Sequence, residues 1–199
     1  MARSFRVVDT GVREGRYNIA LDQAMIEAHQ AGRIPDTFRF MRFPPTALIG
    51  RHQALRQEID VEHCRRQSIG IVRRITGGGA IYLDEGQLGW GLVFHRSALG
   101  AGSLPELARD ICVAVATGLR KLGVEARYRP RNDIEVDGRK VSGTGGFFDG
   151  DTLIYQGTVL VDLDPGRMLS ALRVPAAKLA RHGAASAAQR VVTLRELLG

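Results

Sequence analysis

The segments of this chain that have the pattern of β-strands come in clusters, and only two long helical patterns lie among them. The helical patterns cover residues 18–32 and 104–122, where apolar side chains recur every three or four positions. Strand patterns lie at 37–50 (two strands around Pro44-Pro45), 71–73, 80–83, 88–95, 134–136, from 139, and at 152–163. Strands and helices do not alternate as in a parallel doubly wound sheet. We therefore predict an α+β domain with a mixed, largely antiparallel sheet that carries helices on one side.

Shorter signals complete this prediction. Asp60 can cap a short helix before the strand at 71–73, and further helices are expected after Pro165 and Val192. The chain has no repeat and no linker-like tract, so we expect residues 1–199 to form a single domain.

The composition excludes several classes of protein. Hydrophobic residues make up 44% and charged residues 25% of the chain, which is ordinary for a globular domain. No signal peptide or membrane span is evident. The net charge of +7 suits a phosphate-bearing substrate or an acidic partner, whereas 6% aromatic residues are too few for a nucleic-acid stacking platform. We expect a cytoplasmic protein that binds no membrane and no nucleic acid, with Cys64 and Cys112 as buried thiols.

Three consecutive glycines follow two arginines in RRITGGGAIYLD, residues 73–84. Glycine loses more backbone freedom on folding than any other residue, so such a run needs a reason. A glycine loop between two strands lets a ligand approach the backbone, and its N–H groups can face an anion. The two guanidinium groups suit phosphate or carboxylate. The spacing is neither that of a Walker loop nor of a dinucleotide fingerprint. On these residues alone, a plain hairpin loop with surface arginines remains the alternative.

A lysine stands in a second glycine-rich stretch, RNDIEVDGRKVSGTGG, residues 131–146. Of the 28 basic residues only three are lysines: Lys121, Lys140 and Lys178. An Asp-Gly turn places Lys140 at the start of the returning strand, with Asp133 across the hairpin. A compact ammonium there can neutralise a carboxylate and a phosphate together. The alternative is a solvated hairpin lysine.

These stretches together resemble the signatures of the lipoate-protein ligase A family, within the wider group of biotin and lipoate ligases and octanoyltransferases. RRITGGGAIYLD is similar to RRxxGGGxVxHD, NDIEVDGRKVSGTGG to ND…GRKxSGxA, and IYQGTVLVDLD to the HGTLL strand. NIALDQAM, LIGRHQ and KLARHGAASAAQRVVTLRELL also correspond. The matches run in order from about Arg6 to Leu198, with family-like spacing.

The resemblance implies a catalytic domain related to class II aminoacyl-tRNA synthetases, and a reaction in two steps. Lipoate or octanoate is activated with Mg-ATP to acyl-AMP, with release of pyrophosphate. The acyl group then passes to a lysine of a lipoyl-acceptor protein, such as a 2-oxoacid dehydrogenase acyltransferase subunit or the glycine cleavage H protein.

The resemblance also implies the site. Lys140 matches the lysine that contacts the lipoate carboxyl and the phosphate, and is the expected catalytic residue. The expected ATP and acyl-AMP site consists of Arg74, Gly77, Gly78, Gly79, Ala80, Ile81, Tyr82, Asp133 and Lys140. Lipoate is expected against Gly78, Gly79, Lys140, Arg51 and His52. Asp133 is the candidate ligand of Mg²⁺.

Two positions depart from the family pattern. Leu83 and Gln156 stand where the family often has histidine. Neither matches an ATP-contacting position, so we expect both to line or support the acyl pocket or the acceptor-facing surface.

Other functions stay open at this stage. An octanoyltransferase moves octanoyl from acyl carrier protein without ATP. Its cysteine-dependent branch has a cysteine shortly before the lysine hairpin, where this chain reads EARYRPRNDIEV. A non-catalytic paralogue could hold lipoyl domains, although Arg74, the glycines and Lys140 are retained. Biotin ligation is a further alternative, to which the glycine loop is less similar.

The resemblance implies one more partner. Many ligases of this family continue into a small C-terminal accessory domain, whereas this chain stops at Gly199. We therefore expect a separate accessory protein, needed mainly for the activation step.

Overall fold

The computed structural model describes residues 5–98, 100, 102–173 and 190–199. Its elements are, in chain order, β1 (Arg6–Val12), α1 (Gly15–Gln30), β2 (Thr37–Arg42), β3 (Thr46–Ile49), α2 (Leu55–Glu58), α3 (Val61–Arg66), β4 (Gly70–Arg73), β5 (Ile81–Leu83), β6 (Gln87–His95), the 3-10 helix η1 (Arg96–Ala98), α4 (Leu104–Arg120), β7 (Arg127–Arg129), β8 (Asp133–Val136), β9 (Arg139–Asp149), β10 (Thr152–Leu160), α5 (Pro165–Ala171) and α7 (Leu194–Leu198). Most of the KLARHGAASAAQRVVTLRELL match lies outside the described residues, and the single domain expected for residues 1–199 stays a prediction.

The described strands form two sheets. One is seven-stranded, in the order β1-β2-β6-β10-β9-β8-β7, and the other is three-stranded, in the order β4-β3-β5. β1 pairs with β2 and β3 with β4 in parallel, and the other pairings are antiparallel. The prediction of a mixed, largely antiparallel α+β architecture is confirmed.

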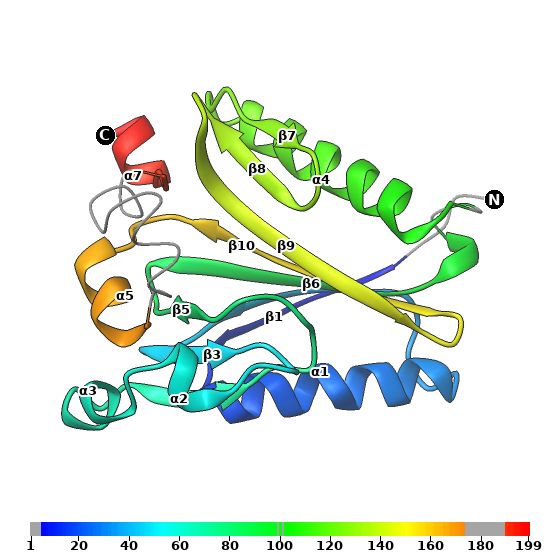
Figure 1. Cartoon of the computed structure of the whole chain (residues 1–199). Coiled ribbons are helices and arrows are strands. Elements are labelled where there is room, and N and C mark those ends of the chain that lie inside the picture. Colours follow the sequence, from blue (N-terminus) through cyan, green and yellow to red (C-terminus); the bar gives the residue numbers. More distant parts are fainter. Residues whose placement is uncertain (1–4, 99, 101, 174–189) are drawn as a thin grey trace.

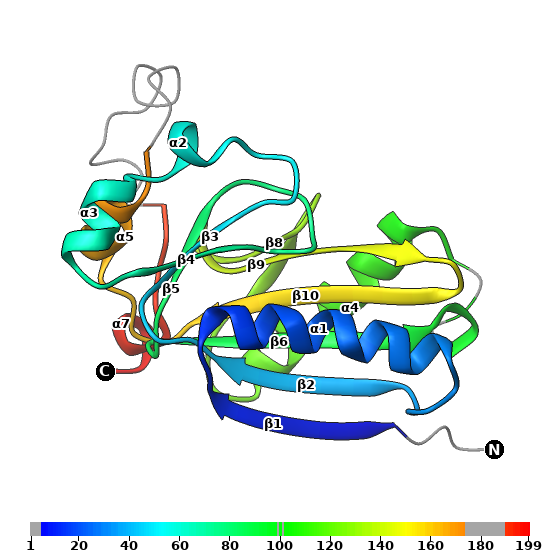
Figure 2. The same ribbon diagram turned by 90° about the horizontal axis from the view of Figure 1, so that it is seen from below.

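The two long helices lie on opposite faces of the seven-stranded sheet, so the prediction of helices on one side is wrong. In Figure 1, α4 lies above the sheet and α1 below it, and in Figure 2 α1 lies in front of the sheet. The central strand β10 explains this arrangement, because successive side chains point to opposite faces. Leu153 and Tyr155 belong to the core that α4 covers, whereas Gln156 bonds to Asp22 of α1. The central strand is buried on both faces, with Leu153 and Ile154 at 0% and 1% exposed, so each face needs a helix to cover it.

Local signals set the helix ends where the sequence predicts them. The Asp60 carboxylate accepts a hydrogen bond from the His63 N–H at 2.8 Å and caps α3, as expected. Ser103 and Glu106 form a capping box at the start of α4. Cys64 on α3 and Cys112 on α4 are fully buried, which confirms the prediction of buried thiols.

The three-stranded sheet carries the loop that matters for the site. Residues 74–80 connect β4 to β5, on either side of the buried central strand β3. The turn after β3 is tied to this loop, because the Arg51 N–H donates to the Thr76 carbonyl at 3.0 Å. The Arg73 guanidinium adds hydrogen bonds to the carbonyls of Gly50, Arg51 and Gln53. The part of the loop that precedes the glycines is therefore anchored to the turn after β3.

Across the described ranges, none of the helices has the length and apolar character needed to cross a bilayer.

Candidate functional site

A cavity of about 390 Å³ is lined on one side by the glycine loop and on the other by strands β6, β10 and β9 of the seven-stranded sheet. It brings together most of the residues that the sequence predicted, from different elements: Arg74, Gly77, Gly78, Gly79, Ala80, Ile81, Tyr82 and Lys140. Apolar side chains form much of its remaining wall, among them Ile19, Met41, Phe43, Leu48 and Leu83. Such a mixture of an apolar wall and a few cations suits a ligand with an apolar chain and an anionic head.

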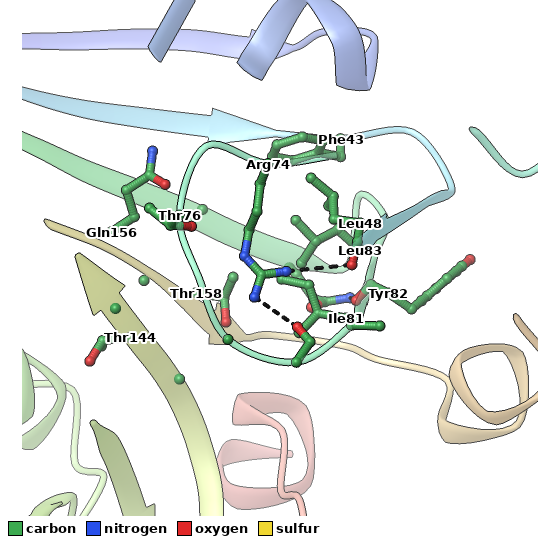
Figure 3. Close-up of a pocket in the computed structure, with 18 of the residues that line it drawn as sticks. Phe43, Leu48, Arg74, Thr76, Ile81, Tyr82, Leu83, Thr144, Gln156 and Thr158 are labelled. Carbon is green, nitrogen blue, oxygen red and sulfur yellow. Dashed lines mark hydrogen bonds between the residues drawn. The ribbon is translucent and has the colours of Figure 1, made fainter. Parts of the chain in front are cut away.

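Arg74 closes the glycine loop from inside. Its Nη2 donates to the carbonyl oxygens of Gly77 and Gly79, each at 2.7 Å, and Nε also donates to Gly77 at 3.2 Å. Nη1 reaches the Leu48 carbonyl at 3.5 Å. Figure 3 shows the guanidinium surrounded by the loop. Burial lowers the pKa of Arg74, but a guanidinium stays protonated at neutral pH. Arg74 therefore fixes the loop and also places a positive charge in the cavity wall.

The loop glycines leave space that side chains would fill. Gly78 has φ +93, and a Cβ on it would lie 2.9 Å from Arg74 Nη2. A Cβ on Gly50 would lie 2.0 Å from the Gly78 carbonyl oxygen, so the two turns approach each other at backbone distance. At Gly77 and Gly79 a Cβ would meet no protein atom within 4 Å. Because these two residues line the cavity, added side chains would occupy ligand space.

Lys140 lies opposite the loop at the start of β9. Its Nζ forms an ion pair with Asp133 Oδ1 at 2.6 Å. Its backbone is held by two hydrogen bonds, from its N–H to the Arg190 carbonyl at 2.7 Å and from the Val192 N–H to its carbonyl at 2.9 Å. A Cβ on Gly143 would lie 2.6 Å from both Cε and Nζ of Lys140. The lysine side chain thus runs over Gly143, in space that only a glycine leaves free.

Glycines also form part of the cavity wall on the sheet itself. Thr158 of β10 pairs with Gly89 on one side and with Gly143 on the other. Gln156 pairs with Gly91 and Gly145 in the same way. Paired residues lie on the same face of a sheet. The face toward the cavity is therefore nearly bare backbone across three strands, with Thr158 and Gln156 standing between the glycines.

A buried polar network borders the cavity at Asp22 of α1. The Asp22 carboxylate accepts from Arg39 Nη1 at 2.7 Å and from Gln156 Nε2 at 2.6 Å. Arg39 in turn donates to the Asn18 side chain at 2.5 Å and to Thr10 Oγ1 at 3.1 Å. Burial raises the pKa of Asp22 to about 6, against the opposing effects of Arg39 and Gln156. The network fixes the side chain of Gln156, which lines the cavity.

The remaining predicted residues lie elsewhere. Arg51 and His52 are exposed in the turn after β3 and are not among the residues that line the cavity. Asp133 is also absent from the lining and stands behind Lys140 as its ion-pair partner. The lipoate-binding role of Arg51 and His52 and the metal role of Asp133 stay predictions. Leu83 and Gln156 both line the cavity, as their positions led us to expect.

Sequence reasoning missed Asp22, Gly143 and Gly145 as site residues. Asp22 had a usable signal, since it is a carboxylate on the inward face of the amphipathic pattern at 18–32. The alternating glycines at 143 and 145 also had one, because two glycines on the same face of a strand indicate close approach by another group. Neither signal says which group approaches.

Among the described residues, the charged groups that line the cavity do not form a resident metal site. In the part of the chain that the structure describes, no group of three or more His, Cys, Asp or Glu side chains could hold a metal ion. A Mg²⁺ ion that binds together with ATP takes most of its ligands from phosphate oxygens and water, so it needs only one carboxylate from the protein. Asp133, whose metal role stays a prediction, pairs with Lys140, the one lysine among the described residues of the lining.

Neither cysteine is placed to form an acyl-enzyme in this cavity. The chain has two cysteines, both are described, and neither lines the cavity. Burial raises the pKa of the Cys64 thiol, which disfavours the reactive thiolate. The Cys112 Sγ contacts Thr144 Oγ1 at 3.4 Å and the Tyr155 hydroxyl at 3.6 Å, in the core beneath α4.

The mixed α+β fold and a cavity with an apolar wall and two cations suit an enzyme that acts on an acyl group, and comparisons with known proteins give the family. Residues 14–199 match the family model described as the lipoyl protein ligase A/B catalytic domain, and the chain belongs to this family. It is 30% identical to the octanoyltransferase LipM of Kyrpidia tusciae, over 99% of this chain and 80% of that protein. It is 28% identical to a probable lipoate-protein ligase A of Mycoplasma genitalium, over 96% of this chain but 56% of that protein. A bi-partite lipoate protein ligase from Thermoplasma acidophilum, studied with its E2 lipoyl domain, superposes with a TM-score of 0.85 at 25% identity, over 100% of this chain and 77% of that chain.

Membership establishes an enzyme of the lipoate ligase and octanoyltransferase group, and an α+β fold shared with the lipoate ligases. It leaves open whether the acyl group is activated by ATP or received from a carrier protein.

Proposed function

We propose that this chain is a lipoate-protein ligase that activates lipoate, or octanoate, with ATP to acyl-AMP and transfers the acyl group to a lysine of a lipoyl-acceptor domain. The observation that carries the proposal is the cavity at Lys140: it contains an ammonium, a guanidinium and a glycine loop, but no thiol. An adenylate route needs charge stabilisation and no enzyme nucleophile, and these residues supply that.

In the first step the chain's residues offset repulsion between two anions. A carboxylate oxygen of the acid attacks the α-phosphorus of ATP, the bond to the β-phosphate oxygen breaks, and pyrophosphate leaves. Mg²⁺ bound with ATP neutralises phosphate charge. Lys140 faces the carboxylate and the α-phosphate, and Arg74 keeps the glycine loop in a shape that admits the nucleotide.

In the second step the neutral ε-amine of the acceptor lysine attacks the acyl carbonyl carbon, and AMP leaves with the electrons of the anhydride bond. The attacking nitrogen loses one proton to water or to the departing AMP. The apolar wall around the acyl chain keeps water from the mixed anhydride, which would otherwise hydrolyse.

A second candidate function is octanoyl transfer from acyl carrier protein, which the similarity to octanoyltransferase LipM favours. That route needs an enzyme group to carry the octanoyl thioester. Cys64 and Cys112 are both fully buried and lie outside the cavity lining, so either would require a rearrangement to react.

The two candidates are separated by two assays on one preparation. The first is exchange of radiolabelled pyrophosphate into ATP with lipoate, and the second is transfer from octanoyl carrier protein to a lipoyl domain without ATP. Because an accessory protein is expected for the activation step, we expect slow acid-dependent exchange by this chain alone, lost in Lys140→Ala and retained in Gly118→Ala. Gly118 is an exposed position on α4, where a Cβ would meet no atom within 4 Å.

Each of the other outcomes would support a different conclusion. ATP-independent octanoyl transfer that is lost in Cys112→Ser or Cys64→Ser would replace the ligase by the transferase. Transfer from presynthesised lipoyl-AMP without exchange would support the second step and the expected accessory protein for the first. Binding of a lipoyl domain without any transfer would support the non-catalytic alternative.

A further inference from the structure

Gln156 is flanked by glycines on its level of the cavity wall. On both neighbouring strands its partner is a glycine, Gly91 on β6 and Gly145 on β9. A Cβ built on Gly145 would meet no protein atom within 4 Å, so the space beside Gln156 is open cavity. Its side chain is therefore the main group that a ligand would meet at this level of the sheet.

The Gln156 amide is held in one orientation. Its Nε2 donates to Asp22 Oδ2 at 2.6 Å, and a carboxylate accepts but does not donate, so the nitrogen end of the amide must face Asp22. Asp22 is itself fixed by Arg39, which is buried and only 1% exposed. The amide oxygen consequently points away from Asp22. In Figure 3 it points toward the side of the cavity where Thr76 lies.

Strand geometry gives the backbone separation between Gln156 and the cationic end of the cavity at Lys140. The Lys140 ammonium lies over Gly143, two residues along β9 from Gly145, the partner of Gln156. Two residues advance about 6.7 Å, and the step to the next strand adds about 4.8 Å at a right angle, so the separation is about 8 Å. A ligand whose carboxyl meets Lys140 would bring the distal part of an octanoyl-sized chain to Gln156.

Ile19 and Met41 supply apolar wall near that distal part, and Asp22, which holds the Gln156 amide nitrogen, is the other polar side chain there. An amide oxygen covered by a plain alkyl end loses its contact with water and gains no partner. A chain end with a hydrogen-bond donor or a polarisable heteroatom offsets part of that loss.

We propose that Gln156, held by Asp22, is the specificity-determining residue for the distal end of the acyl chain, and that it favours an end bearing polar or polarisable atoms, such as the dithiolane of lipoate, over the methyl end of octanoate. The inference rests on the proposed function, because it takes the carboxyl end of the acid to lie at Lys140.

The test measures binding of three acids to the full chain by isothermal titration calorimetry: lipoate, octanoate and 8-hydroxyoctanoate. In the wild type, lipoate and 8-hydroxyoctanoate should each bind about tenfold more tightly than octanoate. This series needs no variant. If 8-hydroxyoctanoate bound tenfold more weakly than octanoate, as a wholly apolar end would require, the proposal would be wrong.

Variants then assign the effect to one side chain. Gln156→Leu should reduce the ratio of octanoate to lipoate dissociation constants to about one. Thr158→Val is the matched control, on the same strand and face but level with Gly143, and it should change both constants by the same factor. An unchanged ratio in Gln156→Leu, or an equal change of ratio in Thr158→Val, would overturn the assignment.

The failure of this inference is distinct from failure of the proposed function. If the wild type bound none of the three acids, also when ATP or a non-hydrolysable ATP analogue was present, the proposed function itself would fail. If it bound all three equally, only the role of Gln156 would fail.

Discussion

The cavity is bordered by two glycine-rich segments that use the same residue for different purposes. In the loop after β4, Gly78 adopts φ +93, and Arg74 holds the carbonyls of its two neighbours. In β9, Gly143 and Gly145 have ordinary strand backbone, and their missing side chains leave room for Lys140 and for open cavity. The loop needs glycine for its backbone conformation, whereas the strand needs it for space. Substitutions in the loop should therefore lower both stability and activity, whereas substitutions in the strand should lower activity and leave stability nearly unchanged.

The largest effect is expected at Lys140, whose ammonium lies in the space that Gly143 leaves free. Lys140→Ala should reduce ATP-dependent lipoylation by about 10²–10³, because a preorganised charge at the reacting groups is lost. The melting temperature should stay near the wild-type value, since the Lys140 side chain is 39% exposed and its backbone bonds do not depend on it.

Lys140→Arg should fail similarly, because a planar guanidinium does not fit the space above Gly143 that the ammonium occupies. Near wild-type turnover in either variant would remove Lys140 from the mechanism.

The second largest effect is expected at Gly78 in the glycine loop. Gly78→Ala adds a Cβ at 2.9 Å from Arg74 Nη2 and imposes a φ that alanine rarely adopts. We expect the free energy of unfolding to fall by about 1–2 kcal/mol, together with a loss of pyrophosphate exchange of at least tenfold. Denaturant unfolding and exchange assays on the same preparation measure both. A folded variant with normal turnover would mean that the segment is a plain hairpin loop.

The strand glycine sharpens the contrast. In Gly143→Ala the new Cβ clashes only with the flexible end of Lys140, which can swing away, so the free energy of unfolding should change by less than about 0.5 kcal/mol. Activity should still fall by about tenfold, because the ammonium is displaced. If stability fell as much as in Gly78→Ala, the distinction between the two segments would be wrong.

The smallest effect is expected at Asp133. Asp133→Asn removes the ion-pair partner of Lys140, and partly exposed pairs contribute about 0.2–1 kcal/mol, so activity should fall about two- to fivefold. The Mg²⁺ concentration for half-maximal activity should rise if Asp133 is also a metal ligand. An unchanged Mg²⁺ dependence would leave it with the ion pair alone.

The sequence predicted most of the strands and helices because their signals are local, but it did not predict β1 or α2. Helical periodicity, the Asp60 cap and the Asp-Gly turn each act within a few residues, and the observed elements begin and end close to the expected positions. The glycine loop and Lys140 were recognised because they form contiguous motifs, and they line one cavity. The lining does not include Arg51 and His52, which were predicted from a similar motif.

What the sequence by itself determined is the set of elements and the chemistry they carry: an α+β order, a glycine loop after two arginines, and a lysine after a tight turn. Only the tertiary structure decided that α1 and α4 cover opposite faces, that Arg74 turns back to close its own loop, and that Gln156 meets Asp22, 134 residues away in the chain. The physical reason is the separation along the chain over which each interaction acts. Propensity and capping are settled among near neighbours, whereas these contacts depend on the order and register of strands, which place distant residues on one face of the sheet.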